Sequence, residues 1–239
     1  MEDKIIIGVP VHNDLTYFKM MVESLFKSTD THFLLLVIES ESTDGSREYS
    51  DALNAIYPSR DIEIIHTKKE GPLKAYNKLF DIATERKCNL LLTQTDVVFP
   101  RLVGRDWLNE FIYLGKKEEI GAVVTLNGGG YSGPRYVKDF MWAGAWCTYI
   151  PYTTLKEIGK YDENFILGDA VDIDWSYRIS KAGKRIQIAN YWVDHHWQTA
   201  HDNEAMPHEE LERIKKANGV YFRKKHKLQE FENENSNID

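Results

Sequence analysis

Several acidic side chains stand where a predicted strand ends or a predicted helix begins, and such positions favour ligand chemistry. Asp96 follows the apolar start of LLLTQTDVVFP, and Glu39 ends another apolar run. In open α/β sheets, ligands bind at the carboxyl ends of the strands. A third acidic segment, GDAVDID, places Asp169 and Asp172 at the start of a predicted helix. These carboxylates could bind a metal or accept a proton, and the alternative is that each belongs to a polar turn or a helix cap.

The composition limits the classes of protein to consider. The 239 residues include 42% hydrophobic and 28% charged residues and carry a formal net charge of −7. This is typical of a soluble globular protein and lacks the positive charge of a nucleic-acid binder. The two cysteines, Cys88 and Cys147, have no metal-like spacing, which favours a reducing compartment. No apolar run approaches the ~20 residues of a membrane span or forms a signal peptide, so we expect a cytoplasmic protein without a transmembrane segment.

The first half of the chain alternates short apolar runs with helical patterns, as in a parallel sheet covered by helices. Strands are expected at 5–9, 33–38, 62–65 and 90–92, and helices at 15–26, from about 46 to 56, and at 72–83. A polar turn is expected at 10–14. Asp44 should cap the second helix, and Gly45 should permit the turn before it.

The second half is less regular. Helices are expected at 106–116, 153–158, 168–182 and 207–227, strands at 122–126 and 185–189, and a strand or bend at 140–150. The glycine-rich segment NGGGYSGPR (127–135) has no periodicity and should be a mobile loop. Residues 228–239 are polar enough to form a disordered tail. The sequence shows no repeat or linker, so we expect one domain over residues 1–227.

Four segments resemble, in order, family 2 glycosyltransferases of the GT-A fold. They are GVPVHN, VIESESTDGS, EGPLKAYNKLFDIA and LLLTQTDVVFP, and the last is similar to the D-x-D strand of the family. Further on, GKYDENFILGDAVDIDWSYRISKAGKRI resembles the G-x-F-D-E…E-D-x-D-L segment, followed by VDHHW. The resemblance implies an α/β fold with a Rossmann-like, mostly parallel sheet. It also implies a nucleotide-binding half (1–100), an acceptor-side half (101–227), and inverting transfer from a UDP- or GDP-linked sugar to a glycan or lipid-linked acceptor.

The resemblance also implies the residues that bind the donor. Glu39 would accept hydrogen bonds from the base or ribose, and Lys74 would lie in the first turns of a helix, where the dipole favours phosphate. The donor-binding residues are expected to be Pro10, Asn13, Glu39, Lys74, Asn77, Gln94, Thr95 and Asp96.

A divalent metal, Mn²⁺ or Mg²⁺, would neutralise the departing diphosphate in such an enzyme. Asp96 occupies the last position of the D-x-D motif, whereas Gln94 replaces its first aspartate. His195 or His196 matches the histidine that completes the metal site in the family. The resemblance favours His195 of the two.

The general base is expected in the GDAVDID segment. Asp172 matches the catalytic acid of E-D-x-D-L, and Val171 replaces the usual glutamate. Asp169 is the second candidate base, and its spacing from Asp172 also fits a helix N-cap. Asp174 and Arg178 are four residues apart on the same helix and should form an ion pair.

The acceptor side is expected to carry aromatic side chains, since sugar faces stack on aromatic rings. The candidates are Trp142, Trp146 and Tyr131, although core packing explains Trp146 equally well. The loop 128–133 could close over the donor as a lid.

Two other functions fit parts of the sequence. Gln94 and Val171 keep open a degenerate glycosyltransferase that binds a nucleotide sugar or glycan without turnover. A sugar-phosphate nucleotidyltransferase would need a glycine-rich, basic loop after the first strand, and PVHND is not one. The basic residues near the C-terminus could touch an anionic membrane, although a solvated helix face is the alternative. These residues are Arg223, Lys224, Lys225 and Lys227.

Overall fold

The computed structural model describes residues 4–131, 140–196 and 207–228. The strands in these ranges are β1 (Ile5–Val11), β2 (Leu34–Ser40), β3 (Asp61–Thr67), β4 (Asn89–Thr93), β5 (Val97–Val98), β6 (Ile120–Val124), β7 (Gly129–Tyr131), β8 (Met141–Ala143), β9 (Cys147–Ile150), β10 (Arg185–Ile188) and β11 (Asp194–His195). The helices are α1 (Leu15–Ser28), α2 (Ser46–Ile56), α3 (Pro72–Glu85), α4 (Trp107–Gly115), α5 (Tyr152–Ile158), the 3₁₀ turn η1 (Ile166–Gly168), α6 (Val171–Lys181) and α8 (His208–His226).

The central sheet has seven strands in the order β10-β6-β9-β4-β1-β2-β3. Only β9 runs antiparallel to its neighbours, β4 and β6, and the other pairs in this sheet are parallel. Two small antiparallel pairs, β5 with β11 and β7 with β8, lie outside this sheet. The expected mostly parallel α/β sheet is therefore confirmed.

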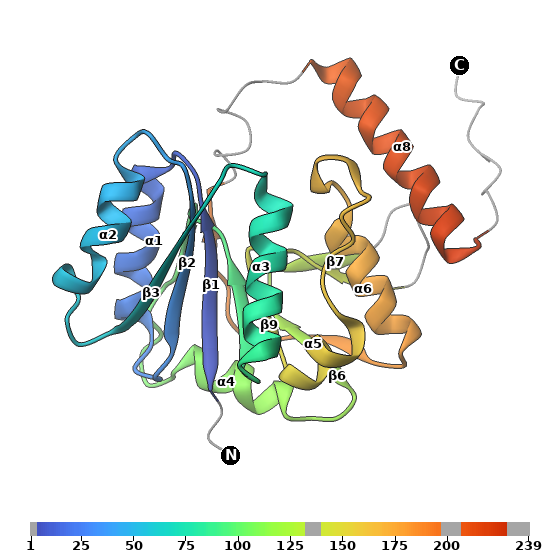
Figure 1. The fold of residues 1–239 in the computed structure, drawn as a ribbon. Coiled ribbons are helices and arrows are strands. Elements are labelled where there is room, and N and C mark those ends of the chain that lie inside the picture. Colours follow the sequence, from blue (N-terminus) through green and yellow to red (C-terminus); the bar gives the residue numbers. More distant parts are fainter. Residues whose placement is uncertain (1–3, 132–139, 197–206, 229–239) are drawn as a thin grey trace, which may run out of the picture.

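Helices cover both faces of the sheet because successive side chains of its buried strands point to opposite sides. Ile5 and Ile7 of β1 pack in one core cluster with α1, α2 and α4, whereas Ile6 belongs to a second cluster with α3, α5, α6 and α8. Helix α3 approaches β1 so closely that a Cβ on Gly8 would lie 2.7 Å from Cδ2 of Leu79. Figure 1 shows α3 beside β1, and α8 on the opposite side of the molecule from α1 and α2.

The structure corrects several expected boundaries. Strand β1 continues through Pro10, which we expected in a turn, because Pro10 pairs in register with Ile38 of β2. Strand β6 is Ile120–Val124 rather than 122–126. Part of the expected glycine-rich loop is strand β7, paired with β8, and residues 132–139 lie outside the described ranges. The lid at 128–133 therefore stays a prediction.

Two expected helix caps are also corrected. The N-cap of α2 is Gly45, with φ of 97° as the expected turn requires, and Asp44 instead accepts hydrogen bonds from the backbone N–H of both Leu15 and Ser46. Asp44 thus connects the starts of α1 and α2. Asp169 does not cap α6, because the N-cap is Ala170, in the left-handed region with φ of 67°.

In the part of the chain that is described, no helix combines the length and the apolar character needed to cross a membrane. The C-terminal helix α8 begins and ends within one residue of the expected range.

Candidate active site

Asp96 and His195 lie together at the end of the sheet where β4 finishes. Strand β11 pairs with β5, which sets His195 opposite Val97. As a result, Nε2 of His195 lies 3.4 Å from Oδ2 of Asp96, with only 5% and 3% of the two side chains exposed. A carboxylate and an imidazole in this arrangement are suitable ligands for Mn²⁺ or Mg²⁺.

The two adjacent histidines have different surroundings. The ring of His195 stacks on Trp146, with centroids 5.1 Å apart, and Trp146 donates a hydrogen bond from Nε1 to the carbonyl of Asn127. The backbone N–H of His196 donates to the carbonyl oxygen of Asp96, while its ring lies 5.5 Å from that of Tyr17. Of the two histidines, His195 is therefore the one whose side chain lies against the Asp96 carboxylate in the described part of the chain.

Asp14, which the sequence analysis assigned only to a turn, belongs to the same group of side chains. Thr95 donates a hydrogen bond from its hydroxyl to the Asp14 carboxylate. The pKa of Asp14 is raised to about 6, mainly by burial and also by the negative charges of Asp96 and Asp44, against the lowering effect of the hydrogen bond from Thr95. The structure thus places a second carboxylate near Asp96, although Gln94 has replaced the first aspartate of the motif.

Tyr76 of α3 lies close enough to Asp96 and Asp172 for both charges to act on its hydroxyl. Its hydroxyl forms a hydrogen bond with Gln94, and its side chain is 8% exposed. Burial raises the pKa of Tyr76, and the nearby charges of Asp96 and Asp172 raise it further. The Tyr76 hydroxyl therefore keeps its proton at neutral pH.

Asp172 lies in the first turn of α6 and is partly buried. Burial raises its pKa to about 6, the charge of Asp169 adds to this, and a hydrogen bond from the backbone N–H of Ile173 to Oδ1 opposes it. A carboxylate with such a pKa is ionised at neutral pH yet more basic than an exposed aspartate, which suits a general base.

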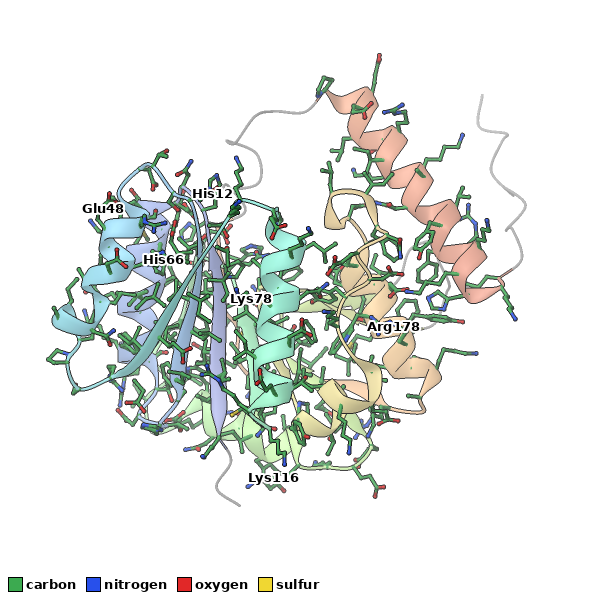
Figure 2. The ribbon with its side chains drawn as sticks, in the orientation of Figure 1. His12, Glu48, His66, Lys78, Lys116 and Arg178 are labelled. Carbon is green, nitrogen blue, oxygen red and sulfur yellow. The ribbon has the colours of Figure 1, made fainter. Side chains whose placement is uncertain are left out.

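Glu39 lies near the end of β2, and its role towards the base or ribose stays a prediction. It is completely buried, and its carboxylate accepts hydrogen bonds from the backbone N–H of Ser42 and from Arg47, and contacts Nδ1 of His66 at 2.8 Å. These contacts hold the turn between β2 and α2. His66 also contacts Asp51, and Figure 2 shows His12 and His66 at the end of the sheet where β1 and β3 finish.

The other expected donor residues also contact the protein itself. Asn77 is 2% exposed. Its side-chain amide donates a hydrogen bond to the carbonyl oxygen of Tyr161 and accepts one from the backbone N–H of the same residue. Lys74 forms an exposed ion pair with Glu70. Asn13, with φ of 49°, accepts a hydrogen bond from the backbone N–H of Thr43. Asn77 thus joins α3 to the loop before α6.

Of the expected acceptor-side aromatics, Trp146 stacks on His195, and Trp142 lies beside Trp146. Trp142 packs edge-on against Trp146, with ring centroids 5.7 Å apart. Trp146 is only 8% exposed, whereas Trp142 is partly exposed. Tyr131 pairs with Met141 through its backbone, and its side chain lies outside the description.

A buried ionic cluster joins α6 to α8. Asp174 forms the expected ion pair with Arg178 at 3.0 Å, and also contacts Lys225 at 2.7 Å and His226 at 2.8 Å. Lys225 contacts Asp162 as well. Lys225 is therefore an internal anchor of α8, which corrects its assignment to a membrane-facing or solvated surface.

The comparisons with known proteins agree with this architecture. The model of glycosyl transferase family 2 matches residues 6–138, and the chain therefore belongs to this family. No curated protein matches the sequence.

Three solved structures share the fold. The mannosyltransferase PcManGT from Pyrobaculum calidifontis, in complex with GDP-Man and Mn²⁺, has a TM-score of 0.65 at 16% identity over 95% of this chain and 65% of its own. GalNAc-T7 with UDP, GalNAc and Mn²⁺ has a TM-score of 0.63 at 12% identity over 92% of this chain and 50% of its own. TarS from S. aureus in complex with UDP-GlcNAc has a TM-score of 0.59 at 15% identity over 93% and 72%. The chain thus has the GT-A fold and spans less than two thirds of PcManGT and GalNAc-T7.

Proposed function

We propose that this protein transfers a sugar from a UDP- or GDP-linked donor to an acceptor hydroxyl, with inversion at the anomeric carbon. The observation that carries the proposal is the Asp96–His195 contact at 3.4 Å, formed at the carboxyl end of β4 in a family 2 chain. The solved relatives that hold GDP-Man, UDP or UDP-GlcNAc support the choice of donor class.

Residues 1–100 would bind the nucleotide, and residues 101–227 the acceptor, within one domain. Asp96 and His195 would hold Mn²⁺ or Mg²⁺, with diphosphate oxygens as further ligands. No group of three or more His, Cys, Asp or Glu side chains is arranged for a metal in the described ranges, and a metal held by two side chains and a substrate diphosphate fits this finding. The bound ion would act as a Lewis acid on the leaving diphosphate.

Asp172 would act as the general base. Its carboxylate accepts the proton of the acceptor hydroxyl while that oxygen attacks the anomeric carbon from the side opposite the diphosphate. The bond to the diphosphate breaks in the same step, so the configuration inverts. Trp142, partly exposed beside Trp146, offers an aromatic face for a glycan or lipid-linked acceptor.

The test is a hydrolysis and transfer assay over a panel of UDP- and GDP-sugars with Mn²⁺. The wild type should release one of the two nucleoside diphosphates. Asp172→Asn should lower kcat about a hundredfold or more, in the range for loss of a general base, without loss of nucleotide binding. Asp169→Asn is the matched control and should have a smaller effect. Binding of a donor without any turnover by the wild type would instead indicate a degenerate, binding-only member of the family, as Gln94 and Val171 allow.

A further inference from the structure

The backbone that leads into Asp172 has an unusual conformation. In the 166–170 segment, Leu167, Gly168 and Ala170 have positive φ angles of 55°, 72° and 67°. A left-handed conformation at residues other than glycine is strained and persists only where the surroundings impose it. The segment therefore needs external contacts to hold Asp172 in one position.

Asn218 of α8 provides these contacts. Its Oδ1 accepts a hydrogen bond from the backbone N–H of Ile166 at 2.9 Å, and its Nδ2 donates to the carbonyl of Ile166 at 3.0 Å. The same Nδ2 lies 3.3 Å from both the carbonyl oxygen and Oδ2 of Asp169. Asn218 is 1% exposed, and a buried amide is tolerated where its polar atoms are bonded. One side chain thus holds both ends of η1.

Helix α8 has other anchors, so Asn218 is not needed merely to attach it. Phe222 is fully buried against Tyr177, with ring centroids 5.4 Å apart. Tyr221 donates a hydrogen bond to Asp162, and Lys225 contacts Asp162 and Asp174. Helix α8 is therefore held in place by these other contacts, and Asn218 connects it to the 166–170 segment.

We propose that Asn218 is a positioning residue for catalysis, which fixes the 166–170 segment and thereby directs the Asp172 carboxylate at the acceptor hydroxyl. This inference rests on the proposed role of Asp172. It extends the proposed functional site to the C-terminal helix α8. Asn218 also orients Asp169, whose charge acts on Asp172.

The test compares Asn218→Ala and Asn218→Asp with the matched control Tyr221→Phe, which removes a different hydrogen bond of α8. Amide hydrogen exchange at Ile166 reports the contact directly, without any need for activity. In Asn218→Ala the Ile166 amide should exchange at least about tenfold faster, and kcat should fall by about tenfold to a hundredfold at nearly constant donor KM. Tyr221→Phe should leave Ile166 exchange and kcat unchanged.

The pH profile separates positioning from a merely structural role. Loosening of the segment in Asn218→Ala should admit water to Asp172 and so lower the pKa of its carboxyl. The acidic limb of the pH profile of kcat should therefore move to lower pH. Asn218→Asp adds a negative charge beside Asp169, so the limb should move to higher pH. A structural role alone would lower the folded fraction and leave the limb in place.

Three outcomes would overturn the inference. They are unchanged Ile166 exchange in Asn218→Ala, equal loosening in Tyr221→Phe, and faster exchange with unchanged kcat and pH limb. Turnover of Asp172→Asn at the wild-type rate would place the error in the proposed base, while the exchange data would still show whether Asn218 holds the segment.

Discussion

Nε2 of His195 lies 3.4 Å from Oδ2 of Asp96, and this contact joins the segment after β4 to β11. The pairing of β5 with β11 sets the backbones of the two residues close together and so supports this contact. Such support reduces the ordering cost of binding a metal and a diphosphate.

His195 and His196 allow a matched comparison of neighbouring side chains. His195→Ala removes the imidazole beside Asp96, so Mn²⁺ affinity in the presence of the preferred nucleoside diphosphate should weaken by about tenfold or more. His196→Ala removes a ring that packs near Tyr17 and should change the affinity little. Titration of free Mn²⁺ by electron paramagnetic resonance measures both. Equal losses in the two variants would contradict the assignment of His195.

Ionisation of Asp172 should lower the free energy of unfolding, because the folded state favours its protonated form. Its folded pKa of about 6 lies above the ordinary aspartate value of 3.8, so Asp172 favours folding most below pH 3.8 and loses that contribution as the pH rises through about 6. This pKa difference corresponds to about 3 kcal/mol at most in the free energy of unfolding. Asp172→Asn should therefore raise the melting temperature at pH 8 and have little effect at pH 4, measured by calorimetry.

Asp162 provides the control of opposite sign for that experiment. Burial alone would raise its pKa, but hydrogen bonds from Lys225, the N–H of Asn164 and Tyr221 lower it overall. Its contribution to stability is present at neutral pH and is lost as the pH falls. Asp162→Asn should lower the melting temperature at pH 8, and a rise there would refute the electrostatic description of this region.

The Asp174 cluster should dominate the attachment of α8. Burial alone would raise the pKa of Asp174, but hydrogen bonds with His226 and Lys225 and the charge of Arg178 lower it overall. Asp174→Asn leaves these cations without their buried partner and should cost about 3–5 kcal/mol in the free energy of unfolding. Denaturant unfolding measures this cost.

The exposed pair between Lys160 and Asp81 is the control for Asp174. Asp81→Asn should change the free energy of unfolding by less than about 1 kcal/mol. A similar small effect of Asp174→Asn would show that α8 is held by its apolar contacts alone.

The sequence predicted the parallel strands well because strands buried on both faces appear as continuous apolar runs, as in β1, β2 and β4. It did not predict the antiparallel β9 or the split of residues 140–150 into two strands, since these depend on pairing with β4, β6 and β7. Strand pairing across long sequence distances leaves no local signal.

The candidate site was predictable to a similar extent. Asp96, His195 and Asp172 stand in motifs, and the structure places the first two in contact. The surroundings of Glu39 and Asn77 could not be predicted, because their partners His66 and Tyr161 are distant in the chain. Asn218 carried no signal, since an isolated asparagine in a helical pattern is ordinarily read as solvent-exposed.

The most direct test of the proposed function is the thermal stabilisation of wild type and Asp96→Asn by UDP and GDP, with and without Mn²⁺. At a hundredfold excess over Kd, a ligand contributes about 2.7 kcal/mol, which corresponds to a rise of about 5–10 °C in Tm for a chain of this size. We expect one of the two nucleotides to stabilise the wild type in this way only with Mn²⁺, and Asp96→Asn to lose the effect. Equal stabilisation without the metal, or in Asp96→Asn, would contradict a metal-assisted glycosyltransferase site built on Asp96 and His195.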